Sequence, residues 1–409
     1  MLARRVLAAA ITLVLVGAVF VSAVGALGPT NTHPQAVPGL ENVRDYAPAP
    51  VTGGLSYAVD AGLLYAGGPT QWQRVDTPDG VIVNAVALDR ERPGTVYIGA
   101  ANELAIYVSR DAGRSWMRIP LDTEAIGAVT DLAVDSANRL VYVGTDTDGV
   151  HRLRDVGTSL IAAGHLLLDE PVLQLAADNS GAGLAFVRTQ WNLYRAQEFG
   201  LVWETVDELP DVATALAIAD TTPPTVYVGT ANSGLFASQD GLAWQAVNTG
   251  LGLAPGARLH VDALAVDPAQ PQVLYAATSY LLGSTVVHQT LLGVYMSQDG
   301  ATQWTKLADA PESAIVELLP VPGQTGAVYA LTETSRTPLA LGNAPAMAAT
   351  SPAAQEAQTG LSFSDVLAWI FAGLAALMLL VAVGLDIVRC YELDVRKQLG
   401  RRRSAEAKR

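Results

Sequence analysis

The chain has a single cysteine, Cys390, among 409 residues, and aromatic residues make up only 6% of it. One thiol provides no intramolecular disulfide, no CxxCH haem attachment and no lipoprotein cysteine after the first apolar run, so the fold depends on its own core. Charged residues are also scarce at 16%, whereas hydrophobic residues reach 50%. This composition excludes a disordered chain, which is poorer in apolar residues and richer in charge.

Basic residues are few in the middle of the chain. Between residues 28 and 364 there are 15 Arg and Lys against 34 Asp and Glu, a net charge of −19, whereas the whole chain carries −14. Binding to phosphate backbones needs a basic face, so the acidity excludes nucleic acid as the main partner. It favours instead a partner with a basic surface.

Two uncharged apolar runs lie near the ends of the chain, at residues 6–27 and 366–385. Runs of 22 and 20 residues are long enough to cross a bilayer of about 30 Å as helices. Arg4 and Arg5 precede the first run and eight basic residues follow the second, so both termini are expected in the cytoplasm. The sequence therefore predicts a cell-membrane protein with two spans, whose central segment lies outside the cytoplasm.

A cleaved signal peptide is the alternative for the first run, since Val24, Gly25 and Ala26 are small enough for a cleavage site. The run is longer than the usual apolar region of about 7–15 residues, which favours an uncleaved anchor. The resulting segments are an anchor at 1–27, a Pro/Gly-rich linker at 28–54, a repeat domain at 55–341, an Ala/Pro-rich linker at 342–362, a second membrane helix at 363–388 and a basic tail at 389–409.

An internal repeat fills the central segment. An apolar stretch ending in Asp is followed by a VYVGT-like stretch, and the Asp residues recur every 42–47 residues, at positions 89, 135, 178, 220 and 267. Alternating apolar residues with Val, Tyr and Thr, bounded by Gly, Pro, Asn and Asp, indicate short β-strands. This period matches one four-stranded blade of a β-propeller. We expect an all-β, seven-bladed propeller, or a six-bladed one if the partial units at 55–76 and 315–341 combine.

A turn motif closes each repeat. Residues 109–116 fit S-x-D-x-G-x-x-W, two later turns keep the motif imperfectly, residues 196–203 keep its spacing, and Asp155 and Gly157 remain in the weakest copy. Asp and Ser bind nearby backbone groups in a tight turn, Gly supplies positive φ, and Trp covers apolar surface. The residues assigned to this structural role are Ser109, Asp111, Gly113, Trp116, Ser238, Asp240, Gly241, Trp244, Ser297, Asp299, Gly300 and Trp304.

These turns resemble the Asp-box, or BNR repeat, of sialidase- and sortilin-type β-propellers. Over residues 55–341 the chain looks most like exported propellers similar to the photosystem II assembly factor. That resemblance implies the propeller fold and a role in binding or assembly, whereas the likeness to sialidases implies glycoside hydrolysis. The chain departs from these relatives in its two membrane spans and its strongly acidic propeller.

The resemblance to sialidases implies three arginines, a Tyr–Glu pair and an acidic Asp, with the first arginine in an F/Y-R-I-P motif ahead of the Asp-boxes. Residues 118–120 read R-I-P but follow Trp116, which is the wrong place for that motif. Carboxylate pairs such as Asp169-Glu170 and Asp207-Glu208 are interpreted as solvated loop charges. We expect no catalytic residue, and an exo-acting glycoside hydrolase is the alternative.

Metal and cofactor signals are weak. Asp146, Asp148 and Asp155 imitate the second half of an EF-hand loop, but its first position falls on Gly144, inside a VYVGT strand. No metal-ligand spacing relates the five histidines, His33, His151, His165, His260 and His288. We therefore expect no metal, no cofactor and no small-molecule substrate.

The sixth repeat departs from the others. Residues 279–293 form an insertion, and residues 248–260 form a long connection before it. In propellers of this topology such loops emerge on the face opposite the Asp-boxes, so the two segments are expected to be neighbours. An apolar patch rimmed by polar groups suggests a protein or membrane contact, and a longer hairpin packed on its own blade is the alternative. The candidate binding residues are Arg258, His260, Tyr280, Leu281, Leu282 and His288, with Trp191 on the same face.

Departures from a repeat are where function is added, so these segments favour a binding role. We interpret the protein as a scaffold or assembly factor for another membrane or envelope protein. A receptor-like ligand-binding protein is a further alternative, although a tail of 21 residues is too short for a signalling domain.

Overall fold

The computed structural model describes residues 39–68, 71–252, 257–283, 288–309, 311–345 and Leu385. Within these residues, no helix has the length and apolar character that crossing a membrane requires. The spans expected at 1–27 and 363–388 and the basic tail at 389–409 lie outside the described residues, Leu385 excepted. The membrane topology therefore stays a prediction.

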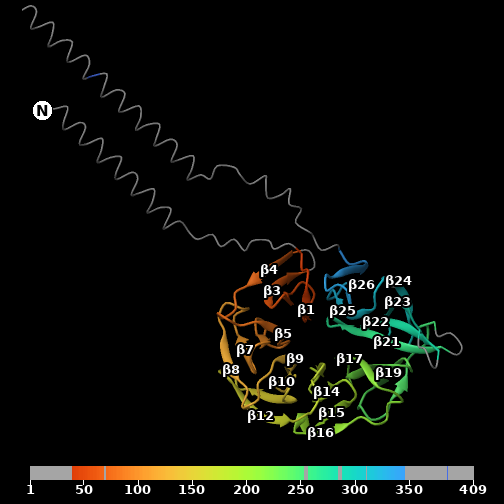
Figure 1. Ribbon diagram of the computed structural model, residues 1–409, viewed down its shortest axis with the longest axis horizontal. Coiled ribbons are helices and arrows are strands. Elements are labelled where there is room, and N and C mark those ends of the chain that lie inside the picture. The colour runs from red at the N-terminus through yellow and green to blue at the C-terminus, as the bar shows by residue number, and fades with distance from the viewer. Residues whose placement is uncertain are drawn as a thin grey trace, which may run out of the picture. The chain divides into compact units, whose positions relative to one another are not determined.

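Seven sheets follow one another around a common axis, and Figure 1 shows them as the blades of a ring. In each sheet the strands pair in chain order, and the first strand lies nearest the ring axis. Six sheets have four strands and the last has three among the described residues. The expected all-β, seven-bladed propeller is confirmed, and the six-bladed alternative is wrong.

The strands of the first four blades are β1 (Val43–Ala47), β2 (Ser56–Asp60), β3 (Leu63–Gly68) and β4 (Gln71–Val75); β5 (Val83–Leu88), β6 (Val96–Ala100), β7 (Ala105–Ser109) and β8 (Met117–Pro120); β9 (Val129–Asp135), β10 (Leu140–Thr145), β11 (Val150–Asp155) and β12 (Leu160–Leu166); and β13 (Gln174–Ala177), β14 (Ala185–Arg188), β15 (Leu193–Gln197) and β16 (Val202–Thr205). A 3₁₀ turn, η1 (Glu198–Gly200), joins β15 to β16.

The strands of the last three blades are β17 (Ala213–Ala219), β18 (Thr225–Thr230), β19 (Leu235–Ser238) and β20 (Gln245–Ala246); β21 (Arg258–Asp267), β22 (Gln270–Leu282), β23 (His288–Ser297) and β24 (Thr305–Asp309); and β25 (Ile315–Pro320), β26 (Ala327–Thr332) and β27 (Leu339–Gly342).

The propeller begins earlier than the repeat pattern indicated. Strand β1 lies inside 28–54, the segment expected to be a linker, so the first blade is complete. Its sequence, VRDYA, contains two charged residues and lacks a clear alternation of apolar and polar residues, so the strand is difficult to recognise from the sequence. Asp45 supports it from within, because its carboxylate accepts hydrogen bonds from the backbone N–H of Tyr46 and of Val86.

The core consists of seven apolar clusters, one between each pair of neighbouring blades. The cluster between the last blade and the first contains Val43 and Trp72 on one side and Leu319 and Tyr329 on the other. A backbone hydrogen bond of 3.1 Å from Val43 N to Arg336 O adds to this contact. The ring is thus closed by the same side-chain packing that joins its other blades.

The glycine of the VYVGT stretch has a packing reason. A Cβ on Gly99, Gly144 or Gly229 would lie 2.3–2.5 Å from a methyl group of Val129, Val172 or Val261, each of which lies in the inner strand of the next blade or just before it. Such a contact is sterically forbidden, so only glycine lets the neighbouring blade approach this closely. The repeat therefore encodes blade-to-blade packing as well as strand formation.

Candidate functional site

The ring has two faces of different composition. Because all strands are antiparallel, loops joining first to second and third to fourth strands emerge on one face, and the remaining loops emerge on the other. We call the first the Asp-turn face, since it carries the turns at 109–116, 238–244 and 297–304. The second is called the insertion face, since it carries residues 279–293.

The Asp turns are held by their own side chains. Ser109 Oγ accepts a hydrogen bond from Gly113 N at 2.7 Å and donates one to Asp111 Oδ1 at 2.8 Å. Asp111 also accepts a bond of 2.8 Å from Ser115 N. These bonds, above all those from Ser115, lower the pKa of Asp111 to about 2.

The imperfect copies achieve the same geometry. The turn of 238–244 is one residue shorter, and Gly241 N donates to Ser238 Oγ at 2.8 Å. In the turn of 297–304, Ala301 N takes the place of the glycine N–H and donates to Ser297 Oγ at 2.9 Å. Gly300 precedes it with φ of +70°, a left-handed conformation that suits glycine. The shifted glycine of this copy is therefore compatible with the same turn.

The tryptophans of these turns bind the preceding blade. Trp116 Nε1 donates to Asp76 O and Trp304 Nε1 to Val247 O, both at 2.9 Å. Trp244 packs edge-on against Phe186, with ring centroids 6.4 Å apart. These tryptophans thus link neighbouring blades.

Tyrosines in the second strands of four blades, which sequence reasoning did not single out, bind the following blade. Tyr57, Tyr142 and Tyr227 donate to backbone carbonyls of the next turn at 3.0–3.3 Å. Tyr97 donates to the carboxylate of Asp155 at 2.8 Å. The regular recurrence of these tyrosines along the sequence was the signal from which their role in joining blades could have been inferred.

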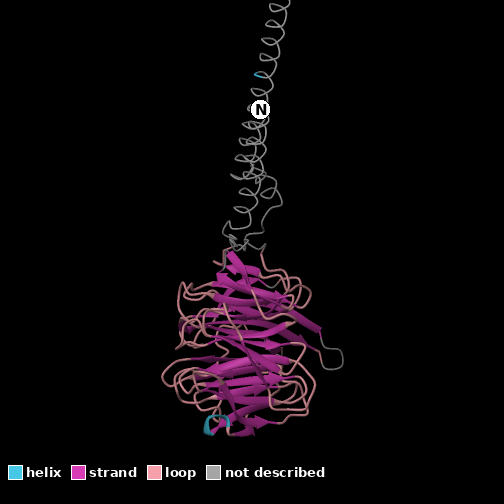
Figure 2. Cartoon of the chain, turned by 90° about the vertical axis from the view of Figure 1, so that its left-hand side faces the viewer, coloured by secondary structure: helices cyan, strands magenta, loops and turns pink. Residues whose placement is uncertain are grey.

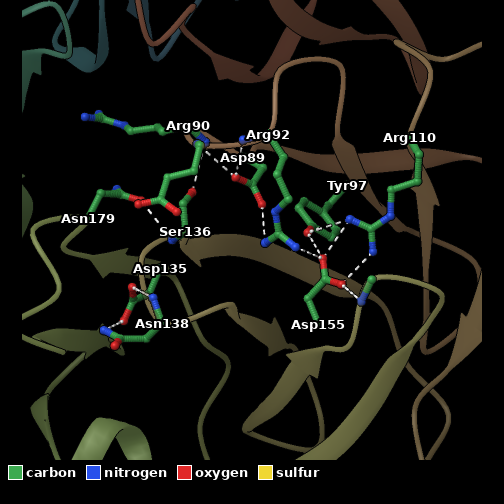
Figure 3. A network of polar contacts seen from close by, with 12 residues as sticks. Asp89, Arg90, Arg92, Tyr97, Arg110, Asp135, Ser136, Asn138, Asp155 and Asn179 are labelled. Atoms are coloured by element: carbon green, nitrogen blue, oxygen red, sulfur yellow. Dashed lines mark hydrogen bonds and ion pairs between the residues drawn. The ribbon is translucent and has the colours of Figure 1, made fainter.

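Asp155 is the centre of a buried charge network (Figure 3). It is 2% exposed, and its carboxylate lies 2.7 Å from the Arg110 guanidinium and 3.0 Å from that of Arg92. Arg92 in turn contacts Asp89 at 2.6 Å. Burial alone would raise the pKa of Asp155, but the bonds from Arg110, Gly157 and Tyr97 lower it. The charges compensate one another, which indicates a structural network rather than a reactive group.

A second chain of polar contacts crosses the same face. Ser136 Oγ accepts from Arg90 N at 2.9 Å, and Asn179 Oδ1 accepts from Ser136 N at 3.0 Å. Asp220 accepts from Asn179 N at 2.8 Å and forms an ion pair with the Arg90 side chain. These contacts connect the second, third, fourth and fifth blades. Of the recurring Asp residues, which were interpreted as strand markers, Asp220 therefore also ties blades together, and Asp267 does so by accepting a hydrogen bond from Gly323 N of the last blade at 2.9 Å.

Carboxylates also line the inner strands. Asp131 accepts from Leu175 N of the next blade at 2.6 Å, as Asp45 does from Val86 N at 2.7 Å. Burial, together with the charge of Asp45, raises the pKa of both Asp131 and Glu317 to about 8. Burial of both groups therefore favours their neutral form.

A hollow of about 380 Å³ lies between the first and last blades. Its lining includes Ser56 of β2, Gln71 and Gln73 of β4, and Gln324 of the loop between β25 and β26. No Asp, Glu or His contributes to the described lining. The hollow therefore offers no acid–base pair for hydrolysis, which needs two carboxyl groups.

The two insertions of the sixth blade meet in one sheet. Strand β22 is 13 residues long, whereas its counterparts in the other blades have at most 6. Arg258 pairs with Leu281, and Leu282 pairs with His288. We call residues 258–261, 279–283 and 288–292 the tongue. It extends beyond the other blades in both views (Figures 1 and 2).

The expected binding residues have different roles in the tongue. Arg258 donates to Gly283 O at 3.0 Å and to Asn232 Oδ1 at 3.1 Å, so it supports the hairpin. His260 contacts Ala231 O at 2.9 Å. Tyr280 packs against the core between the fifth and sixth blades.

The outer part of the tongue faces solvent. Leu282 is 46% exposed, His288 is exposed, and Leu281 is half-buried. Trp191 is 63% exposed in the loop between β14 and β15, on the same face but two blades away. The structure thus joins six of the seven candidates in one tongue and leaves Trp191 apart from it.

Asp148, His151 and His165 meet on the insertion face, which sequence reasoning missed. Of the three acidic residues interpreted as an EF-hand imitation, Asp148 belongs to this group of candidate metal ligands, whereas Asp146 and Asp155 do not join it among the described residues. The only sequence signal for this cluster is that His151 and His165 lie on neighbouring strands. Recognising that they face each other requires the pairing of β11 with β12.

The fold and its loops define the class of protein as a seven-bladed β-propeller with one enlarged blade. No family model matches the chain, and no curated protein matches it. Among solved structures, it is similar to the GH74 xyloglucanase from Xanthomonas campestris, with a TM-score of 0.54 and 21% identity over 73% of this chain and 51% of that one.

Two YCF48 structures are also similar. YCF48 bound to D1 peptide has a TM-score of 0.53 and 15% identity, covering 75% of this chain and 95% of that one. YCF48 from Cyanidioschyzon merolae has a TM-score of 0.51 and 14% identity, covering 75% and 96%. The chain spans about half the length of the xyloglucanase. At these identities the likeness shows the fold, and both hydrolytic and peptide-binding propellers share it.

Proposed function

We propose that this protein is a membrane-anchored β-propeller of the Asp-box type that binds another membrane or envelope protein as a scaffold or assembly factor. The propeller lies outside the cytoplasm and both termini lie inside it. The Asp-turn face maintains the ring, and the insertion face contacts the partner.

The tongue is the observation that carries this proposal. The backbone pairing of β23 with β24 covers residues 293–296, whereas no described strand pairs with the outer edge of residues 288–292. A free strand edge of this kind accepts an extended peptide by main-chain hydrogen bonding. Leu282 adds an exposed apolar contact at the tip.

The YCF48 structures support the proposal by size and by binding mode. The chain matches nearly the whole length of both, and one of them holds a peptide. A single propeller of this size is therefore sufficient for peptide binding. The acidity of residues 28–364 indicates that the bound segment is basic.

The test is capture of partners from detergent-solubilised membranes with two matched variants. Leu282→Asp places a charge on the tongue, and Leu242→Asp places the same charge on the Asp-turn face at a position of similar exposure, 46% against 47%. We expect a membrane or envelope protein to be retained by wild type and Leu242→Asp and lost by Leu282→Asp. Equal capture by both variants would contradict the proposal.

Glycoside hydrolysis is the second candidate, favoured by the likeness to GH74 enzymes and by the raised pKa of Asp131 and Glu317. A carboxyl group with a pKa near neutrality is suited to general acid catalysis. Release of sugar from xyloglucan or related glycans, abolished by Asp131→Asn or Glu317→Gln, would establish this activity and replace the scaffold proposal.

A further inference from the structure

We propose that Asp148, His151 and His165 form a binding site for a divalent transition metal, with Zn²⁺ as the best fit. Asp148 Oδ2 lies 2.8 Å from His151 Nε2 and 3.6 Å from His165 Nε2. The three residues can each offer one ligand atom such that all three atoms lie within 4.8 Å of one another. Zn–N bonds of about 2.0–2.1 Å place neighbouring ligand atoms of a tetrahedral site about 3.3 Å apart, so small side-chain movements complete the geometry.

The fold gathers these residues by strand register. His151 and His165 pair directly across β11 and β12, so both rings lie on the same side of the sheet. Their centroids are 4.2 Å apart, with an angle of 18° between the planes. The Nε2 atoms of both rings lie near the same carboxylate oxygen, so the two imidazoles are placed to bind one ion together.

The loop between β10 and β11 holds the carboxylate in place. Thr145 Oγ1 accepts from Asp148 N and donates to Gly149 O, both at 2.9 Å. Gly149 has φ of +66°, and a Cβ there would lie 2.0 Å from Leu166 O. Glycine is therefore required for the loop to lie against the end of β12, beside His165.

The donor set identifies the chemical class of the ion. Two imidazole nitrogens and one carboxylate oxygen suit Zn²⁺ and related transition metals, whereas Ca²⁺ and Mg²⁺ prefer oxygen ligands. His165 Nε2 also contacts the backbone oxygen of Asp148 at 2.7 Å. A bound metal replaces the protons that hold these contacts in its absence.

The site is accessible from one side. Asp148 and His151 are buried, whereas the His165 side chain is 38% exposed. Three protein ligands leave a fourth coordination position for water or for a donor group of a bound molecule. This arrangement is typical of catalytic zinc sites, whereas structural zinc sites have four protein ligands. The site lies on the insertion face, and its test does not depend on the scaffold proposal.

The test is Zn²⁺ titration of the tag-free full chain by calorimetry, with Co²⁺ absorption as a report of ligand geometry. His165→Ala removes the exposed ligand, and His260→Ala is the matched control. His260 also faces a carboxylate, Asp262, at 3.8 Å, but no second histidine joins this pair among the described residues. Circular dichroism verifies that both variants are folded.

We expect wild type and His260→Ala to bind one Zn²⁺ at this site with equal affinity and to melt at a higher temperature when it is bound. His165→Ala should bind more than about tenfold more weakly, since loss of even an outer-shell partner has an effect of this size. No saturable binding by wild type, or equal affinity in His165→Ala, overturns the proposal and leaves a hydrogen-bonded cluster that only fixes the loop.

Discussion

The two faces of the ring use similar residue types for different purposes. On the Asp-turn face, Trp304 is 1% exposed and donates its indole N–H to the preceding blade, whereas Trp191 on the insertion face is 63% exposed. Asp155 on the first face forms ion pairs with two arginines, whereas Asp148 on the second meets two histidines. The repeated residues hold the blades together, whereas residues outside the repeat pattern include the exposed Trp191 and the cluster of Asp148 with two histidines.

Replacing the two tryptophans by alanine gives the largest expected contrast in stability. Trp304→Ala leaves a cavity between blades and an unsatisfied carbonyl at Val247, so the free energy of unfolding should fall by about 4 kcal/mol. Trp191→Ala should change it by less than about 0.5 kcal/mol. Urea denaturation followed by circular dichroism measures both. Similar losses for the two variants would show that the faces do not differ in this way.

Removing Asp155, the centre of the buried charge network, should have the next largest effect on the free energy of unfolding. Asp155→Ala leaves Arg92 and Arg110 without their shared carboxylate, at a cost of about 3 kcal/mol. Asp309→Ala is the control, since it breaks an exposed pair with Lys306 of 2.7 Å and should leave the free energy of unfolding nearly unchanged. The same denaturation experiment compares them. A loss below about 1 kcal/mol for Asp155→Ala would mean that the network does not stabilise the ring.

The inner carboxyl groups should give a smaller effect that depends on pH. Burial first, and then the charge of Asp45, raises the pKa of Glu317 from 4.5 to about 8, so the folded state favours its neutral form. Its contribution to stability is present below pH 4.5 and is lost as pH rises through 8. Asp131 behaves in the same way.

The variant Glu317→Gln remains neutral and should therefore lose less thermal stability than wild type between pH 5 and pH 8. Asp79→Asn, at an exposed position, should follow wild type. Melting temperatures at the two pH values measure the difference. Parallel curves for wild type and Glu317→Gln would show that this carboxyl group is not perturbed.

The repeat made the architecture predictable from the sequence. Asp residues spaced by 42–47 positions and a recurring VYVGT stretch predicted seven blades, because each blade buries its apolar residues against the next in the same way. Strand β1 was missed since its few apolar residues lie in a segment rich in Pro and Gly. The structural role of Asp155 was underestimated because it lies in the weakest copy of the turn motif. Its carboxylate contacts Tyr97, Arg92 and Arg110, none of which that motif indicates.

The sites were less predictable than the fold, because they depend on register and on side-chain direction. His151 and His165 are 14 residues apart, and a shift in pairing between Arg152 and Leu153 decides that they face one another. The neighbourhood of Arg258 and Leu281 followed from topology alone. That Arg258 supports the hairpin while Leu282 is exposed is set by local contacts that no repeat pattern contains.

Site-specific photo-crosslinking in intact membranes tests the difference between the faces most directly. A crosslinking amino acid is placed at position 282 on the tongue or at position 242 on the Asp-turn face, two sites of similar exposure. We predict a crosslink to a membrane or envelope protein from position 282 and none from position 242. Crosslinks to the same protein from position 242 alone, or from both positions equally, would contradict the assignment of binding to the insertion face.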